Sequence, residues 1–230
     1  MKVVDVIMIS RATTPALYKI TQDALDSLHG SSQYFHFNVI VYEHYFGIGT
    51  DGKIYSYEYP DEKVFGYNGA VTLMQDSKEP FNYNALMNKG TELGNADWVI
   101  WCNNDVLFSQ GFMEAIEKES EPAACSSWCC LEPTVSGPPE DKYEYGYEIR
   151  KHILGWAIIA RRRLWRIIGG LDTSHAFWFS DNMYAQQLQE YGLNHALLKN
   201  VSITHLHSQT LRTLPYNEIL NLTEGYEPIL

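Results

Sequence analysis

An uninterrupted apolar run, Trp98–Cys102, stops abruptly at three polar residues, Asn103, Asn104 and Asp105. A run this short, rich in β-branched and aromatic residues, predicts a strand that is buried on both faces. Such strands belong to sheets covered by helices, and the ligands of open α/β sheets bind beyond the carboxyl ends of the strands. The run therefore predicts an α/β fold with a carboxylate and two amides at its ligand-binding edge.

The first 43 residues predict a strand, a helix and a second strand. Val3–Ser10 is apolar except at Asp5, and a Thr-Thr-Pro helix start then opens an amphipathic stretch that runs to about residue 28. The second strand, Phe37–Tyr42, is followed by Glu43. A strand–helix–strand unit of this length implies two parallel strands joined by a right-handed crossover, so we expect a mostly parallel sheet.

The rest of the chain predicts more elements of both kinds. Helices are expected at 82–93, 110–118, 161–168 and 180–191, the last with Ser180 as its N-cap; strands are expected at 64–73, 123–131, 195–198 and 201–207, with an extended run at 149–160. Two long loops lie at 46–67, with a hairpin near Asp51-Gly52, and at 132–147. The second loop is acidic and rich in proline, which predicts a mobile lid. Because strand and helix signals resume after it, we expect one domain, 1–230.

Composition narrows the classes of protein that fit. With 230 residues, 45% of them hydrophobic, the chain can bury one large core, and its net charge of −11 argues against a nucleic-acid partner. The dense basic cluster Arg161–Arg163 with Arg166 is expected to be a solvated helix start. The run Val3–Ile9 is too short for a signal peptide and no run could span a bilayer, so we expect a cytoplasmic protein. The cysteines lack zinc-site spacing and are expected to be free thiols.

Asp105 is the first candidate for a metal ligand. A hard divalent cation bound to a diphosphate needs only one or two protein oxygens, since phosphates and water supply the remaining ligands. The alternative interpretation of Asn103-Asn104-Asp105 is an ordinary turn, held by bonds from side chains to the backbone. His205 and His207, two apart in a predicted strand, point the same way and are either further metal ligands or packing residues.

Two helix starts carry the other candidates. Asn84 and Asn88 share a helix face, and the start of that helix lies at the same sheet edge as Asp105, although exposed amides would look the same. Asp181 follows the aromatic segment Phe177-Trp178-Phe179 and lies in the first turn of a helix, where the helix dipole favours an ionised carboxylate. Such a carboxylate suits a base that removes a proton from a hydroxyl, and it is also common as a simple helix-start acid.

In order and spacing, the chain from Val3 to Leu211 resembles the family 2 glycosyltransferases, which are inverting enzymes of the GT-A fold with nucleotide-sugar donors. The similar segments are Val4–Arg11, Val39–Glu43, Tyr83–Gly90, Trp98–Val106, Gly155–Ala160, Arg162-Arg163, Ile168–Asp172, Ser180–Gly192 and His205–Thr210. The family usually has Glu at position 180, and often Asp at 183 and Arg at 187, where this chain has Ser, Met and Gln. These departures leave the acceptor contacts open.

The resemblance implies a central parallel sheet with a smaller antiparallel acceptor side, a nucleotide-sugar half at 1–107, an acceptor half at 108–210 and a tail at 211–230. It implies Asp181 as the catalytic base, and Asp105 and His205 as ligands of Mn²⁺ or Mg²⁺. Donor contacts, with a UDP-sugar favoured, are implied for Ser10, Arg11, Glu43, Asn84, Asn88, Asn103 and Asn104. Trp156, Trp178 and Phe179 are candidates for stacking on the acceptor or for core packing.

The acceptor is expected to be a glycan intermediate or, less in keeping with the charge, a modified nucleobase. Two other functions fit an α/β sheet with a metal-binding acid. A nucleotidyltransferase usually has a glycine-rich basic loop after the first strand, which Ser10–Pro15 lacks. A non-catalytic nucleotide-sugar-binding protein has no need of Asp105, Asp181 and His205 together, and detectable hydrolysis of a donor would exclude it.

Overall fold

The computed structural model describes residues 1–12, 14–43, 46–48, 54–56, 67–74, 81–120, 125–132, 142–177 and 179–207. The strands are β1 (Lys2–Ser10), β2 (Phe35–Glu43), β3 (Phe46–Ile48), β4 (Ile54–Ser56), β5 (Ala70–Met74), β6 (Trp98–Asn103), β7 (Val106–Phe108), β8 (Cys125–Leu131), β9 (Tyr143–Tyr145), β10 (Ala157–Arg161) and β11 (Asn194–His205). The helices are α1 (Pro15–Gly30), α2 (Tyr83–Leu93), α3 (Phe112–Ser120), α4 (Arg162–Ile167) and α5 (Ser180–Glu190).

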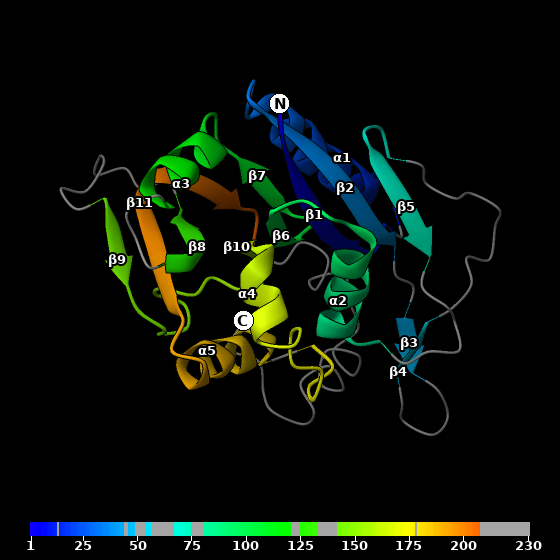
Figure 1. Cartoon of the computed structure of the whole chain (residues 1–230). Helices are drawn as coiled ribbons and strands as arrows, with labels where there is room; N and C mark the ends of the chain where they lie inside the picture. Colours follow the sequence, from blue (N-terminus) through cyan, green and yellow to red (C-terminus); the bar gives the residue numbers. More distant parts are fainter. Residues whose placement is uncertain are drawn as a thin grey trace.

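Within these residues one sheet holds nine strands in the order β5-β2-β1-β6-β10-β8-β11-β7, with β9 paired to β11 (Figure 1). Neighbours among β5, β2, β1 and β6 are parallel, and so are β8 and β11. Strand β10 lies antiparallel between β6 and β8, and β7 and β9 are antiparallel to β11. This confirms the expected fold, a mostly parallel sheet with a smaller antiparallel part.

Helices cover both faces of the sheet and form two apolar cores. On one face, Val6 and Met8 of β1 share a core with Leu25 of α1 and Met113 of α3. On the other face, β1 contributes Ile7 to a second core that includes residues of α2, α4 and α5. Because both faces are covered, the apolar run Trp98–Cys102 is buried throughout, as predicted.

The local predictions differ from the structure at three places. Only residues 157–161 of the extended run are a strand, since Arg150 has a left-handed backbone (φ 66°) and the His152 amide closes a turn onto the Glu148 carbonyl at 2.8 Å. Phe179 (φ 67°), not Ser180, is the N-cap of α5, because the Ser180 hydroxyl donates instead to the Phe177 carbonyl.

The third difference is at the C-terminal end of the sheet, where the two expected strands are one strand, β11, that ends at His205 and leaves His207 outside it. The other predicted helices and strands agree with the structure to within a few residues, apart from 64–73, where only β5 is a described strand. Two described strands were not predicted: β7, and β9, which lies within the expected 132–147 loop. Antiparallel pairing of β3 with β4 flanks the predicted hairpin, whose turn at Asp51-Gly52 lies outside the described residues.

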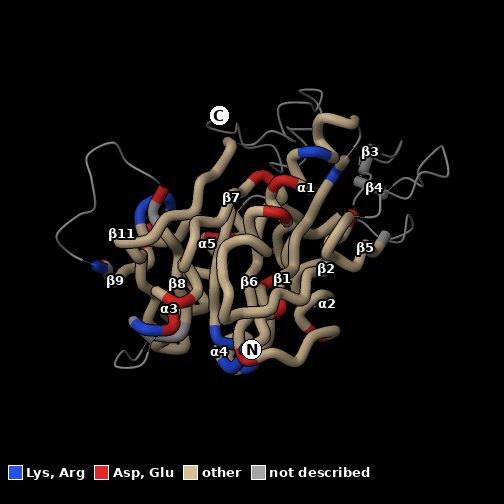
Figure 2. The backbone as a smooth tube through the Cα atoms, turned by 90° about the horizontal axis from the view of Figure 1, so that it is seen from above, with Lys and Arg blue, Asp and Glu red and all other residues tan. Residues whose placement is uncertain are grey.

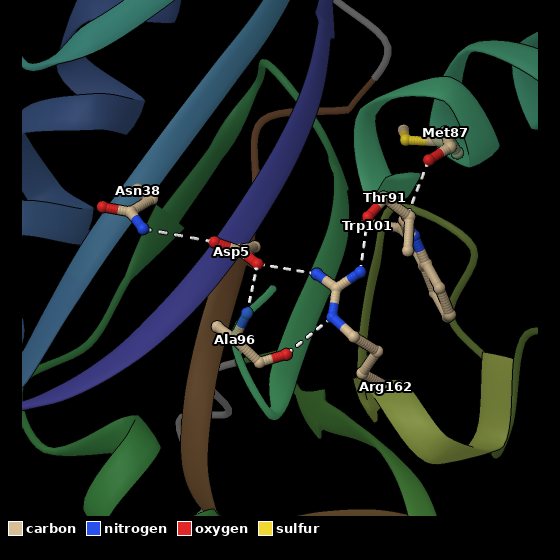
Figure 3. Close-up of polar contacts among 7 residues, drawn as sticks. All are labelled: Asp5, Asn38, Met87, Thr91, Ala96, Trp101 and Arg162. Atoms are coloured by element: carbon tan, nitrogen blue, oxygen red, sulfur yellow. Dashed lines mark hydrogen bonds and ion pairs between the residues drawn. The ribbon is translucent and has the colours of Figure 1, made fainter. Parts of the chain in front are cut away.

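The edge of the sheet where β1 begins holds a buried ion pair (Figure 3). Arg162 Nη2 lies 2.6 Å from Asp5 Oδ2, and each side chain is 4% exposed. The guanidinium also donates to the carbonyls of Thr91 and Ala96, while the Asp5 carboxylate accepts from the Ala96 amide (2.7 Å) and from Asn38 Nδ2 (3.3 Å). The prediction of a fully solvated arginine cluster was therefore wrong for Arg162.

The structure also bears on the expectations about charge, membrane segments and cysteine thiols. In the described part of the chain, Lys and Arg lie in separate places and form no continuous tract (Figure 2). None of the described helices has the length and apolar character needed to cross a membrane. Cys102, Cys129 and Cys130 are buried free thiols, as expected, and burial raises the pKa of Cys129 to about 12. The Cys125 side chain falls outside the described part.

Candidate functional site

Strands β1, β2 and β6 end together at one edge of the sheet, since Ser10 lies opposite Glu43 and Ile9 lies opposite Asn103. Beside the end of β6 is a cavity of about 520 Å³, in the size range of small-molecule sites, and no residue of β1 or β2 is among those that line it. It lies among the ends of β6, β8 and β11, the starts of α2 and α5, and the turn before β10. Its lining includes Tyr83, Asn84, Trp101, Asn103, Glu132, Arg150, Ile153, Leu154, Gly155, Trp156, Ile158, Leu171, Phe177, Phe179, Ser180, Asp181, Tyr184, His205 and His207.

Three of the predicted donor-binding residues form one buried polar network. The Ser10 hydroxyl lies 2.9 Å from Thr21 Oγ1 and 3.0 Å from the Tyr67 hydroxyl. Tyr67 donates to Glu43 Oε2 at 2.7 Å, and Asn104 Nδ2 donates to Thr21 Oγ1 at 2.9 Å. The network links the ends of β1 and β2 to the residue after β6, so it holds this edge of the sheet in one arrangement.

Glu43 is the only carboxylate among the predicted donor-binding residues, and its second oxygen accepts from the Ala12 amide. Burial raises the pKa of its carboxyl group, while the hydrogen bonds from Tyr67, Ala12 and Ser10 oppose that shift. Sequence reasoning missed Tyr67, whose ring also stacks on Tyr18 at 5.0 Å. Arg11, half-buried, follows directly after β1.

Asp105 and His205, the two predicted metal ligands, lie side by side, and His205 lines the cavity while Asp105 does not. His205 is the last residue of β11, and its Nε2 lies 3.3 Å from Asp105 Oδ1. The Leu206 amide donates to the Asp105 carbonyl at 2.8 Å, and the Trp156 ring stacks on the His205 ring with centroids 5.5 Å apart. Nε2 of His205 is buried and makes no hydrogen bond within the described residues. A nitrogen donor beside a carboxylate oxygen fits a divalent cation, so these residues suit the expected Mn²⁺ or Mg²⁺.

Asp181 lies in the first turn of α5, at another wall of the cavity. Burial raises the pKa of its carboxyl group, and hydrogen bonds from the Asn182 amide and its own amide, together with the charge of Arg150, lower it by less. Gly155 borders the carboxylate: a Cβ at this position would lie 3.2 Å from Asp181 Oδ2. The absent side chain leaves the cavity open beside a carboxylate that is a stronger base than an exposed aspartate.

Tyr83 is a site residue that sequence reasoning missed. Its hydroxyl donates to Asn103 Oδ1 at 3.1 Å. Burial raises the pKa of Tyr83 well above that of a free tyrosine, and electrostatic interactions with Cys102, Asp105 and Asp181 add to the effect. The phenol therefore stays protonated within the field of both carboxylates. Its position beside the N-cap of α2 was the available signal, since the same argument selected Asn84.

The two asparagines of α2 have different surroundings. Asn84 lines the cavity, and its Nδ2 donates to the Asp172 carbonyl at 2.5 Å. Asn88 is not among the lining residues, because one turn further along α2 its amide exchanges hydrogen bonds with both backbone groups of Leu171 and accepts from Trp165 Nε1 at 2.9 Å. The structure therefore brings Asn84, and not Asn88, to the cavity wall.

Of the aromatic candidates for acceptor contact, Trp156 and Phe179 line the cavity, and Trp178 lies outside the described residues. Residues 133–141 of the expected lid, most of the 46–67 loop and residues 208–230, which contain the predicted tail, also lie outside the described residues.

The chain matches no protein-family model and no curated protein. Among solved structures, it is similar to TarS 1–349 of S. aureus, with a TM-score of 0.60 and 10% identity over 88% of this chain and 59% of that one. The same TarS segment in complex with UDP-GlcNAc gives 0.62 and 11% over 94% and 62%. A mutant of Drosophila beta-1,4-galactosyltransferase 7 in complex with manganese, UDP-Gal and xylobiose gives 0.54 and 13% over 96% and 79%.

The chain thus spans about three-fifths of the TarS structures that it matches. At this identity the likeness concerns the fold, and the fold is that of the GT-A glycosyltransferases, as the resemblance in the sequence implied.

Proposed function

We propose that this chain is a metal-dependent, inverting glycosyltransferase that transfers a sugar from a nucleoside-diphosphate sugar, with a UDP-sugar favoured, to an acceptor hydroxyl. The observation that carries the proposal is one cavity in a GT-A fold that has Asp181 at one wall and His205 at another, with Asp105 buried directly behind His205 at 3.3 Å. The structural neighbours whose names include UDP-sugars and manganese support the choice of donor and ion.

In this reaction Asp181 takes the proton of the acceptor hydroxyl while that oxygen forms a bond to the anomeric carbon. The bond from this carbon to the diphosphate breaks on the opposite side, so the configuration inverts. A cation held by Asp105 and His205 would offset the charge that develops on the leaving diphosphate. In this proposal residues 1–107 hold the donor and residues 108–210 hold the acceptor.

The remaining groups of the cavity position the two substrates. Tyr83 stays protonated, and its hydroxyl donates to Asn103 Oδ1, which holds the Asn103 side chain in place for the nucleotide sugar. Trp156 and Phe179 provide apolar surface for the acceptor, and Gly155 leaves room for its hydroxyl next to Asp181. The acceptor is a glycan intermediate or, against the acidic net charge, a modified nucleobase.

The first experiment separates chemistry from binding. Asp181→Asn keeps the shape of the side chain and removes its basicity, so transfer should fall by about 10²- to 10⁴-fold while donor affinity, measured by calorimetry, stays nearly unchanged. Asp97→Asn, an exposed residue, is the matched control. A loss of donor binding as large as the loss of transfer would contradict the role of Asp181 as base.

The pH dependence gives a second test of the same residue. The base must be deprotonated, so the rate falls as the pH drops through the pKa of Asp181, and burial places this acid limb at higher pH than for an ordinary aspartate. Because the Arg150 charge lowers this pKa, Arg150→Met should move the limb to still higher pH. A limb that stays in place or moves to lower pH would show that another group controls it.

The donor can be identified by measuring thermal midpoints with UDP-, GDP-, CMP- and dTDP-sugars, each with Mn²⁺ and with a chelator. A donor at 100 times its Kd should stabilise the fold by roughly 2.7 kcal/mol. If none of them shifts the midpoint, a nucleotide-sugar function is excluded for this panel.

A further inference from the structure

Glu132 and His207 lie close to His205 at one corner of the cavity, which all three residues line. Glu132 follows directly after β8, and His207 lies two residues beyond the end of β11. One ligand atom each from Glu132, His205 and His207 lies within 4.8 Å of the others, and His205 also lies 3.3 Å from Asp105 Oδ1. Ligands at ~2.1 Å from one ion are separated by about 3 to 4 Å. Small side-chain movements would therefore bring Glu132, His205 and His207 onto a single cation, with Asp105 next to His205.

The backbone after β11 is bent in a way that directs His207 back to this corner. His207 has a left-handed conformation (φ 59°), which is unfavourable for a residue with a side chain and is typical of functional sites. Its ring lies 5.4 Å from the His205 ring, at an angle of 56°. The prediction that His205 and His207 point the same way assumed that both lie in one strand. Because the strand ends at His205, the turn and not the strand sets the direction of His207.

The chemistry of the four groups selects among cations. Mg²⁺ and Ca²⁺ prefer oxygen ligands, whereas imidazole nitrogen suits first-row transition metals. Two imidazoles with two carboxylates therefore favour Mn²⁺ or Co²⁺ over Mg²⁺. Four protein donors are also more than a cation needs when a diphosphate brings its own oxygens. Such a set can hold the ion alone, with open positions toward the cavity that Glu132, His205 and His207 line.

We propose that Glu132 and His207 complete a four-residue site with Asp105 and His205, so that the chain binds a transition-metal dication before any nucleotide arrives and discriminates against Mg²⁺. This inference rests on the metal role of Asp105 and His205 in the proposed function. It changes the order of events, because the ion becomes a resident part of the protein and the donor diphosphate binds to a preformed cationic centre.

The test is a calorimetric titration of the metal-free full chain with MnCl₂ in the absence of nucleotide. We expect one Mn²⁺ to bind per chain and an equal concentration of MgCl₂ not to displace it. Glu132→Gln and His207→Ala should each weaken Mn²⁺ binding at least tenfold. Glu92→Gln and His36→Ala, which change exposed residues of α2 and β2, are matched controls and should bind as the unaltered chain does.

Circular dichroism in EDTA checks that each variant is folded. Electron paramagnetic resonance of Mn²⁺, which responds to nitrogen ligands, measures binding independently of the calorimetry. Mn²⁺ binding that requires UDP, displacement by Mg²⁺, or unchanged affinity in both site variants would overturn the inference. If Mn²⁺ binds only together with UDP and transfer still occurs, the proposed function stands without it. If Mn²⁺ binds alone but no donor is hydrolysed or transferred, the site is real and the proposed function fails.

Discussion

The two ends of the central sheet each bury a carboxylate beside a basic side chain, and they treat it in opposite ways. At the end where β1 begins, Asp5 and Arg162 are 2.6 Å apart (Figure 3). Arg162 also donates to the carbonyls of Thr91 and Ala96, and Asp5 also accepts from Asn38 and from the Ala96 amide. At the carboxyl end, Asp105 and His205 are 3.3 Å apart, with side chains 4% and 12% exposed, and His205 Nε2 has no hydrogen-bond partner among the described residues.

We interpret the first pair as structural, whereas the second belongs to the metal site that we propose. A buried ion pair is stabilising only if close geometry and additional hydrogen bonds offset the cost of desolvation, and the Asp5–Arg162 pair meets both conditions. In the looser Asp105–His205 pair, the buried Nε2 of His205 makes no hydrogen bond among the described residues, and an unmade hydrogen bond of a buried group costs free energy. Sites that hold ligands commonly carry such a cost. Substitutions at individual residues test this difference between the two pairs.

The largest effect is expected at Arg162. Arg162→Met keeps the length of the side chain but leaves the Asp5 carboxylate buried without its ion partner, so the free energy of unfolding should fall by about 3–5 kcal/mol. Urea denaturation followed by circular dichroism measures it. The same change at exposed Arg163 is the control. Adding Asp5→Leu to Arg162→Met should restore much of the loss; a single-variant loss below about 1 kcal/mol would mean that the pair is not structural.

Thr91 ranks second, because its hydroxyl extends the hydrogen bonds around Arg162. It accepts from Trp101 Nε1 at 2.8 Å and donates to the Met87 carbonyl at 2.7 Å. Thr91→Val leaves the indole N–H unpaired and should cost about 1–3 kcal/mol, again by urea denaturation. Thr72→Val is a matched control, because Thr72 Oγ1 is buried and makes no hydrogen bond within the described part of the chain. Equal losses for the two variants would contradict the argument.

At the other end of the sheet, Asp105→Asn should change the free energy of unfolding by only about 1 kcal/mol in metal-free buffer, because its 3.3 Å contact with the His205 imidazole is longer than the 2.6 Å contact between Asp5 and the Arg162 guanidinium. The same change at Asp5 should cost clearly more, since it weakens the contact with a guanidinium. Parallel denaturation curves of the two variants in EDTA compare the ends directly. If Asp105→Asn is as destabilising as Asp5→Asn, the proposed division of roles is wrong.

The smallest effect is expected at Asn38, which is exposed and donates to Asp5 Oδ1 over 3.3 Å. Asn38→Ala should lower the free energy of unfolding by about 0.5 kcal/mol or less, as at other surface positions. Urea denaturation measures this loss as well. A loss comparable to that of Thr91→Val would show that the contact of Asn38 with Asp5 also supports the ion pair.

Most elements could be predicted from local sequence, for reasons that the structure makes clear. Strands β1 and β6 are buried on both faces and therefore read as continuous apolar runs, while Thr14 and Asn82 accept the N-cap hydrogen bonds expected of α1 and α2. The placement of β10 between β6 and β8 was not predictable, because it depends on antiparallel pairing with residues far away in sequence.

The positions of Asn84 and Asp181 at the cavity wall were predictable, because each side chain lies in the first turn of a helix. The site was not predictable where the role of a side chain depends on a distant segment. The Asn88 side chain is hydrogen-bonded to the backbone of Leu171, and the Tyr83 hydroxyl is hydrogen-bonded to Asn103. Neither contact leaves a periodic or local pattern in the sequence.

The 157 positions that separate Asp5 from Arg162 also bear on how the chain is made. At 5–20 residues per second, Arg162 leaves the ribosome about 3–13 s after Ala96, the other main partner of Asp5. During that interval β1, β2 and β6 can already pair, but the Asp5 carboxylate has no guanidinium and must keep its water. The contact of Asp5 with Arg162 therefore forms late in synthesis, and we expect this end of the sheet to be completed only after α4 has been made.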